Sequence, residues 1–406
     1  MNSRLVLVFL LSAFGISNLA AEAVWPRWRG PSDSGSTPTE GDFPQQLLGD
    51  NIAWKIELPG KGASTPIIWG EHIFVTGQDE GQDVAIALDL KGKELWRTEV
   101  GEARDGKHRN GSSANPSIAT DGEFLFAYFK SGNLAAMKMD GAVLWQTNIQ
   151  ETYGKFSLYW DLGTSPVVTE KHVVIAAMHG GPSYLVAFDK ATGEEAWKVD
   201  RTYEVPVEND HSYSTPLLVD NTIYVWGSEH FTAHSAQDGK KLWDVGEFNP
   251  EGKKNWVVCA SFVISDGIAV TPYGRGAVLH GVSLEGERLW VREGVGSFVP
   301  TPVVYNGNVY VLGDSGEVEC VNPKNGESIW KDKLPRSNAK FYSSPTIAGG
   351  LLYAGNEKGV MYVVNVADGF ELVSENDFGE QIIASPVPVG QQLLVRTALH
   401  LYCIGK

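Results

Sequence analysis

The chain has 406 residues, of which 43% are hydrophobic, and a formal net charge of −16. The acidic balance argues against nucleic acid and anionic lipid surfaces as partners, since both select basic patches. No Lys/Arg cluster in the sequence reverses that balance locally, and the 45 glycines fit sheets joined by frequent turns.

The N-terminal segment has the pattern of a secretory signal. Arg4 is the only charge before an apolar run at residues 5–16, and small residues follow, with Ala20 to Ala23 as cleavage candidates. The run is too short to span a bilayer comfortably. We therefore expect residues 1–23 to be removed on export, to the periplasm or outside the cell. No cysteine stands at the cleavage site, which argues against a lipid anchor.

Residues 24–51 differ in composition from the rest of the chain and are predicted to form an N-terminal arm. Residues 25–31 are aromatic and basic, and residues 32–39 are polar and rich in turn formers. We expect Trp25 and Trp28 to pack on the following domain, with a direct ligand role as the alternative.

From residue 52 onward one unit recurs, and its clearest copy is Ala187–Trp197. A β-type run ends at Asp189, a turn reaches Gly193, and a second strand carries Trp197. A fixed-period repeat of this kind decides the fold. The aromatic end of the unit falls at Trp54, Trp96, Trp145, Trp197, Trp243, Trp290, Trp330 and, with a substitution, Val373.

A second marker runs in phase with the first. It is a pair of small residues, then Pro, then β-branched residues, and its prolines are Pro66, Pro116, Pro166, Pro216, Pro302, Pro345 and Pro386. A degenerate copy at residues 259–262 fills the gap. The two markers together predict eight innermost strands.

These markers resemble the PQQ-like (quinoprotein-type) β-propeller repeat, whose Ala-x-Asp-x-x-Thr-Gly-x-x-x-Trp signature Ala187–Trp197 matches at every defined position. The resemblance implies an all-β, eight-bladed propeller of four-stranded antiparallel blades over residues 52–406. It does not fix an activity, because enzymes, assembly scaffolds and unassigned exported proteins share this repeat. The Trp-Arg-Gly-Pro arm is also similar to that of exported bacterial propeller proteins without a settled activity.

The two ends of the repeat region are complementary. Residues 52–57 look like the last strand of a blade, whereas the C-terminal blade has one strand too few. Pairing these segments would close the ring and remove two exposed sheet edges.

The three cysteines, Cys259, Cys320 and Cys403, fall in different blades, so we expect free, buried thiols. One Trp in the same register of each blade indicates a structural role.

Residues that the repeat does not need carry the functional hypothesis. They lie in connections into the innermost strands and between second and third strands, which reach one face of a propeller. Aromatic, His, Arg and acidic residues there predict a polar pocket with stacking surfaces at the mouth of the central channel; the alternative is that these loops are solvated and self-packed. The predicted ligand-binding residues are Arg109, Asn110, Trp160, Asp161, Asp210, His211, Tyr213, Glu229, His230, Asn255, Trp256 and Arg275.

We expect no metal and no catalytic residue. His211 and His230 with Asp210 and Glu229 could surround a cation, but no tight ligand spacing supports this. The segment His179–Pro182 is similar to the oxyanion segment of esterases, yet no Gly-x-Ser-x-Gly accompanies it.

The favoured function is therefore an exported, monomeric, non-catalytic scaffold that binds a protein, peptide or glycan. The resembling family includes an outer-membrane assembly lipoprotein of this kind. A quinoprotein dehydrogenase is the alternative, and its resemblance implies PQQ with calcium, an adjacent Cys-Cys pair and a catalytic Asp. This sequence has no Cys-Cys, so we expect no cofactor. Another enzyme sited in the funnel is a third interpretation.

Overall fold

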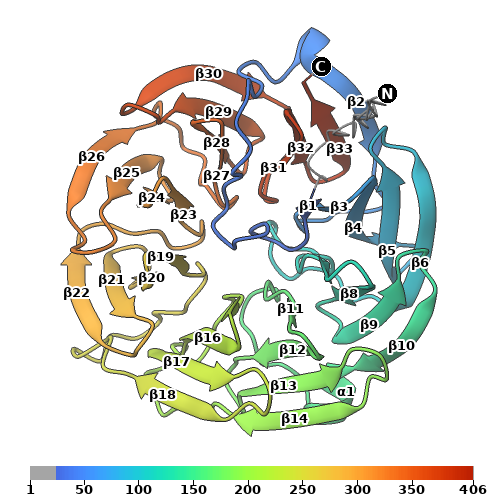
Figure 1. Cartoon of the computed structure of the whole chain (residues 1–406), viewed down its shortest axis with the longest axis vertical. Helices are drawn as coiled ribbons and strands as arrows, with labels where there is room; N and C mark the ends of the chain where they lie inside the picture. The colour runs from blue at the N-terminus through green and yellow to red at the C-terminus, as the bar shows by residue number, and fades with distance from the viewer. Residues whose placement is uncertain (1–23, 406) are drawn as a thin grey trace, which may run out of the picture.

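The computed structural model describes residues 24–405, and these form a ring of eight blades around a central axis (Figure 1). The predicted signal peptide, residues 1–23, lies outside the described residues. No helix within residues 24–405 has the length and apolar character needed to cross a bilayer.

Each blade is an antiparallel sheet, which confirms the predicted fold class. In blades one to seven the strands run in chain order from the axis to the rim, whereas the outermost strand of blade eight comes from residues 52–57. Blades one to four comprise β3 (Ile67–Trp69), β4 (His72–Asp79), β5 (Gln82–Asp89) and β6 (Glu94–Glu102); β7 (Ala119–Thr120), β8 (Phe124–Tyr128), β9 (Asn133–Lys138) and β10 (Val143–Asn148); β11 (Val167–Val168), β12 (His172–Ala177), β13 (Tyr184–Asp189) and β14 (Glu195–Asp200); β15 (Leu217–Val219), β16 (Thr222–Gly227), β17 (His230–Ser235) and β18 (Lys241–Val245).

Blades five to eight follow the same plan. They comprise β19 (Val263–Ser265), β20 (Ile268–Tyr273), β21 (Val278–Ser283) and β22 (Arg288–Glu293); β23 (Val303–Tyr305), β24 (Asn308–Leu312), β25 (Glu317–Val321) and β26 (Ser328–Lys333); β27 (Thr346–Ala348), β28 (Leu351–Gly355), β29 (Val360–Asn365) and β30 (Glu371–Asp377); β31 (Val387–Val389), β32 (Gln392–Arg396), β33 (His400–Ile404) and β2 (Ile52–Glu57).

The ring closes as the sequence predicts. Strand β2 pairs with β33, so the first strand of the repeat region completes the last blade. A short helix, α1 (Ile149–Tyr153), follows β10, and a 3-10 turn, η1 (Gly49–Asn51), precedes β2.

The repeat Trp residues join consecutive blades. The indole Nε1 of Trp54, Trp96 and Trp145 donates to a backbone oxygen in the hairpin turn of the next blade, at 2.9–3.1 Å. Trp243 and Trp290 repeat this contact. The Asp-to-Gly turn and the Trp of the sequence repeat are thus two sides of one interface.

Hydroxyl groups form a second set of links, close to the axis. The backbone N–H of each marker residue donates to a Ser or Thr oxygen of the neighbouring blade at 2.8–3.1 Å. The accepting residues are Ser117, Ser165, Thr215, Ser261, Thr301, Ser344 and Thr65. These residues are called the hydroxyl ring below. In blade two the accepting residue is Ser117, which follows Pro116, whereas in the other copies with a marker proline the hydroxyl residue precedes it.

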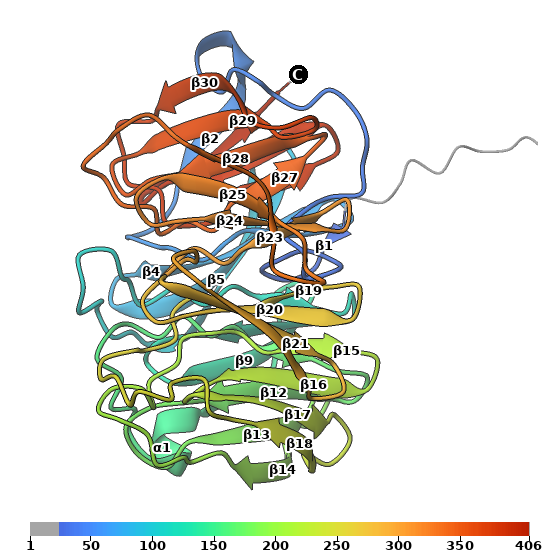
Figure 2. The same ribbon diagram turned by 90° about the vertical axis from the view of Figure 1, so that its left-hand side faces the viewer.

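The N-terminal arm covers one end of the central channel (Figure 1, Figure 2). Its first residues form β1 (Val24–Trp25), which pairs with β3, and Trp25 is 2% exposed. The buried Arg29 side chain donates to the backbone oxygens of Pro302 and Pro345, at 2.9 and 3.0 Å. Burial lowers the pKa of Arg29 to about 9.

The three cysteines are free, and Cys320 and Cys403 are buried. Both pair with a repeat Trp on the outermost strand, Trp330 and Trp54, so they hold equivalent positions.

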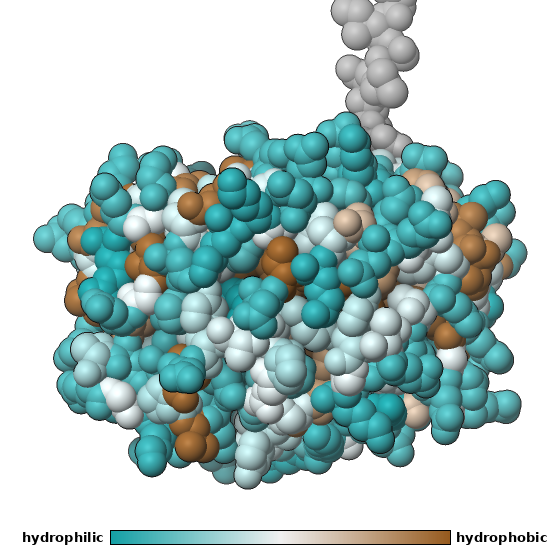
Figure 3. Space-filling model, turned by 90° about the horizontal axis from the view of Figure 1, so that it is seen from below, coloured by the Kyte–Doolittle hydropathy of each residue, from teal (hydrophilic) through white to brown (hydrophobic). Residues whose placement is uncertain are grey.

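The rim carries a row of exposed apolar side chains one place before the repeat Trp, and Leu242 and Ile329 are both 52% exposed. Seen from the side that carries β14 and β18, apolar groups are separated by hydrophilic ones (Figure 3).

Candidate functional site at the mouth of the central channel

Within residues 24–405, a cavity of about 350 Å³ lies on the axis. Its wall comes from connections into several innermost strands and from the turn between β20 and β21, and Trp28 of the arm lines its other end. Five of the twelve predicted ligand-binding residues line it, namely Asn110, Trp160, Asp161, Tyr213 and Arg275. Residues far apart in sequence thus share one cavity.

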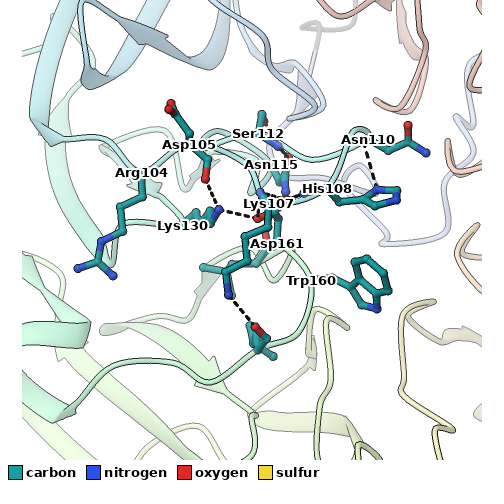
Figure 4. Close-up of polar contacts among 12 residues, drawn as sticks. Arg104, Asp105, Lys107, His108, Asn110, Ser112, Asn115, Lys130, Trp160 and Asp161 are labelled. Atoms are coloured by element: carbon teal, nitrogen blue, oxygen red, sulfur yellow. Dashed lines mark hydrogen bonds and ion pairs between the residues drawn. The ribbon is translucent and has the colours of Figure 1, made fainter.

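Asp161 is the centre of a clasp between two connections (Figure 4). Its carboxylate accepts the backbone N–H of Lys107 at 2.8 Å and of His108 at 3.0 Å, and pairs with Lys130 Nζ at 2.6 Å. A Cβ at Gly111 would come within 1.9 Å of its Oδ2, so only glycine fits there. Asp161 therefore holds the connection before β7 against that before β11, and its charge is already compensated.

Trp160 presents the largest accessible aromatic surface at the cavity. Its side chain is 44% exposed, and the adjacent Tyr159 is 61% exposed. The Trp160 backbone N–H donates to the Tyr213 hydroxyl at 2.9 Å, and the His108 ring meets the indole edge-on at 5.0 Å. These contacts fix the indole in place while leaving it open to solvent.

Asn110 joins its own connection to those of two other blades at the mouth. Its Nδ2 donates to Glu357 at 3.0 Å, and its Oδ1 accepts from Gln381 at 2.6 Å. Arg109 pairs with the same Glu357 carboxylate at 3.1 Å, although its own side chain is 73% exposed. Connections from blades two, seven and eight are therefore linked at the edge of the mouth.

Arg275 lies across the cavity from these residues. Its backbone has φ 57°, between Gly274 and Gly276, which also have positive φ. The guanidinium lies 4.8 Å from the centre of the Phe298 ring, and Nη1 donates to the Asn255 oxygen at 3.2 Å. These contacts hold the guanidinium beside the Phe298 ring at the edge of the cavity.

The other predicted residues do not line this cavity. Glu229 accepts bonds from Asn209, Asn249 and Tyr273, and Asn209 in turn accepts the Trp256 backbone N–H at 2.7 Å. These bonds hold the connections before β15 and β19 together.

His230 lies apart, with its ring stacked on Tyr203 at 3.7 Å and bonded to Asp244 at 2.6 Å. Asn255 reaches the cavity only through its backbone oxygen, on Arg275. The structure therefore does not bring His230 or Trp256 to the axis, because local partners engage both.

His211 and Asp210 belong to a separate cluster of side chains, with Ser157, around Gly180. A Cβ at Gly180 would lie 3.0–3.3 Å from His211 Nε2, Ser157 Oγ and Asp210 Oδ2. Burial lowers the pKa of both His211 and the nearby His179. Among residues 24–405 no group of three or more His, Cys, Asp or Glu is arranged to hold a metal.

Several lining residues were not among those predicted. They are His108, Phe298, Tyr342, Trp28 and members of the hydroxyl ring. The recurring Ser or Thr beside the marker proline was the available signal for the ring, whereas nothing local distinguishes Phe298 or Tyr342 from core aromatics.

The cavity does not fit PQQ with calcium. Calcium requires several oxygen ligands, but Asp161, the single carboxylate among the described lining residues, is already bonded to Lys130 and to two backbone N–H groups. Cys259 lines the cavity without an adjacent cysteine, and burial raises the pKa of its thiol to about 12.

Solved structures share this fold at low sequence identity. A europium-containing methanol dehydrogenase aligns with a TM-score of 0.75 at 12% identity, over 95% of this chain and 98% of that one. BamB from Moraxella catarrhalis aligns with a TM-score of 0.63 at 14% identity, over 87% and 97%. At such identity the likeness concerns the fold alone.

Sequence comparison is more specific. A protein named outer membrane protein assembly factor BamB from Burkholderia pseudomallei is 23% identical over 392 residues, 93% of each chain. One of the same name from Moranella endobia is 24% identical over 344 residues, 82% of each. The family model described as "Outer membrane protein assembly factor BamB" matches residues 49–243, 154–293 and 275–398. Because these matches cover most of the chain, the protein belongs to this family of PQQ-like repeat propellers.

Proposed function

We propose that the protein is an exported, non-catalytic scaffold that binds a partner protein at the mouth of the central channel, in the assembly of outer membrane proteins. The name of the relatives supplies the process. The observation that carries the binding site is the convergence of connections from separate blades on one cavity with a half-exposed Trp160. Arg109, Asn110, Trp160, Tyr213 and Arg275 form the contact surface.

Three further predicted residues hold the connections around this surface in place. Asp161 and Glu229 accept hydrogen bonds from neighbouring connections, and the Asn255 backbone oxygen accepts one from Arg275. A scaffold role also suits the chemistry of the cavity. Asp161, the one carboxylate among the lining residues that the structure describes, is engaged in an ion pair and does not act as a general base in this state.

Site-specific crosslinking tests this proposal. A photoreactive amino acid replaces Tyr159 at the mouth, or, as a control, Ile329 on the outer strand β26, which is also more than half exposed. We expect a crosslink to an outer-membrane assembly component from position 159 and none from position 329. Crosslinks of equal yield from both positions, or from 329 alone, would contradict binding at the mouth.

Substitution separates binding from folding. Trp160→Ala and Arg275→Ala are expected to abolish the crosslink from position 159 while the melting temperature stays within a few degrees. Export is tested separately by mass spectrometry, which should find the mature N-terminus near Glu22 or Val24.

A further inference from the structure

The side chains that line the cavity have unused hydrogen-bond donors and few unused acceptors. Each oxygen of the hydroxyl ring accepts a backbone N–H of the neighbouring blade. Within residues 24–405 none of these seven hydroxyl groups donates to a protein acceptor, so their protons remain available. Thr65, Ser117, Ser165 and Ser344 of this ring line the cavity.

Other lining groups add to this excess of donors. The backbone N–H of Asn110 donates to His108 Nδ1 at 3.2 Å, so the proton of the neutral imidazole lies on Nε2. The indole N–H of Trp28 and of Trp160 has no acceptor within the described part of the chain. The acceptors are already used, because Asn110 Oδ1 binds Gln381 and Asn115 Oδ1 binds Ser112 at 2.8 Å.

Positive charge also gathers at the mouth, although the whole chain carries −16. Lys61 donates to the Arg109 backbone oxygen, and Lys130 and Lys107 lie at the Asp161 clasp. Of the carboxylates nearby, Asp161 and Glu357 are paired with Lys130 and Arg109. Asp314 accepts the backbone N–H groups of Phe298 and Val299, at 3.0 and 3.3 Å. This leaves the Arg275 guanidinium as a cation that lines the cavity without a carboxylate partner among residues 24–405.

From this imbalance we propose that the cavity binds the carboxylate end of a small molecule or chain whose adjoining group is apolar or ring-shaped. Arg275 holds the carboxylate, and the hydroxyl ring supplies further donors. Trp160, Phe298 and Trp28 pack against the adjoining group. Since the arm covers the far end, a chain enters only by its terminus.

The inference rests on the proposed binding function of the mouth and names its ligand chemistry. The volume of about 350 Å³ suits a ligand the size of one substituted amino acid or one sugar acid. The guanidinium is also pre-positioned, since its stacking on Phe298 and its bond to Asn255 restrict it before any ligand arrives.

Calorimetric titration of the mature chain at low salt tests the inference with three probes. They are N-acetyl-phenylalanine, its amide, and glucuronate. We expect one of the two acids to bind at least tenfold more tightly than the amide, which corresponds to about 1.4 kcal/mol. Preference for N-acetyl-phenylalanine would indicate a peptide C-terminus, and preference for glucuronate a sugar acid.

Variants identify the group responsible. Arg275→Gln should weaken acid binding about tenfold and leave the amide unchanged, whereas Arg275→Lys should recover part of the loss. Arg288→Gln is a matched control, because Arg288 also lies over a Phe ring, at 5.6 Å from Phe248, and donates to backbone oxygens, but outside this cavity. It should bind the acid as the unmodified chain does.

Equal affinity for acid and amide, or no binding of either acid up to about 10 mM, would overturn the inference. Unchanged acid binding by Arg275→Gln would do the same. The crosslink from position 159 reports on the proposed scaffold function independently: if it forms while no acid binds, the ligand chemistry is wrong and the scaffold function stands.

Discussion

The indole ring of Trp145 lies directly against Gly193 of the next blade, where a Cβ would come within 2.6 Å of a ring carbon. Gly193 also has φ 74°, and Trp145 Nε1 donates to the Lys190 oxygen in the same turn at 2.9 Å. Equivalent contacts join Gly92 to Trp54 and Gly326 to Trp290. Glycine at this turn position thus meets two separate requirements: a positive φ, and the close approach of the Trp ring from the preceding blade.

The first prediction separates these two requirements. Gly193→Ala must accommodate both a strained φ and the Trp145 ring, whereas Gly267→Ala meets the same φ of 74° with no atom within 4 Å. We expect Gly267→Ala to cost about 1 kcal/mol and Gly193→Ala clearly more, in urea unfolding. Trp145→Ala should cost roughly 3–5 kcal/mol. Equal effects of the two Gly variants would show that the Trp contact contributes nothing.

A second prediction concerns ring closure. A chain that begins at Leu58 lacks β2 and exposes the edge of β33, so we expect aggregation or a much lower melting temperature. A chain that begins at Gly49 lacks the arm but keeps β2, and it is the control. Thermal unfolding followed by circular dichroism compares them, and equal melting temperatures would argue against closure by β2.

The third prediction is a pH dependence of stability. Asp83 is fully buried; its Oδ2 accepts from Asn133 at 3.0 Å, and its Oδ1 has no hydrogen bond within residues 24–405. Burial raises its pKa to about 6. The native state therefore binds this proton more tightly than the unfolded chain, and the stabilisation that it gives is lost as the pH rises from about 4 through 6.

Asp83→Asn should remove that dependence and stabilise the protein at pH 7.5 by roughly 1–3 kcal/mol. Asp189→Asn is the control with the opposite sign, because backbone N–H bonds, chiefly from Thr192, lower the Asp189 pKa. Removal of the Asp189 carboxylate should lower the free energy of unfolding above pH 4. Urea unfolding at several pH values measures both, and an unchanged profile in Asp83→Asn would refute the assignment.

The fourth prediction concerns the arm. Arg29→Ala leaves the oxygens of Pro302 and Pro345 without their donor, at a cost of about 1–3 kcal/mol to arm docking. We expect thermolysin to cleave faster near Phe43 and Leu47, both buried in the intact protein. Arg27→Ala is the control, since Arg27 pairs with Asp33 in a half-exposed position. Similar cleavage rates in both variants would contradict the role of Arg29.

The candidate site was harder to predict than the fold. Asn110, Trp160 and Arg275 lie at the cavity because the propeller brings these connections to one face. His230 and Trp256 stand in similar connections, but Asp244 and Asn209 hold them elsewhere. Only three-dimensional packing distinguishes a side chain that faces the axis from one that braces its own loop.

The sequence by itself determined the number of blades, their strand order and the closure of the ring. Each of these follows from local signals, the Asp-to-Gly turn, the Trp and the marker proline, which recur with the period of one blade. The tertiary structure decided where the arm docks, which hydroxyl groups form the ring at the axis, and that Arg275 lines the cavity without a carboxylate partner among the described residues. These depend on distances between irregular connections of different blades, which no repeat in the sequence encodes.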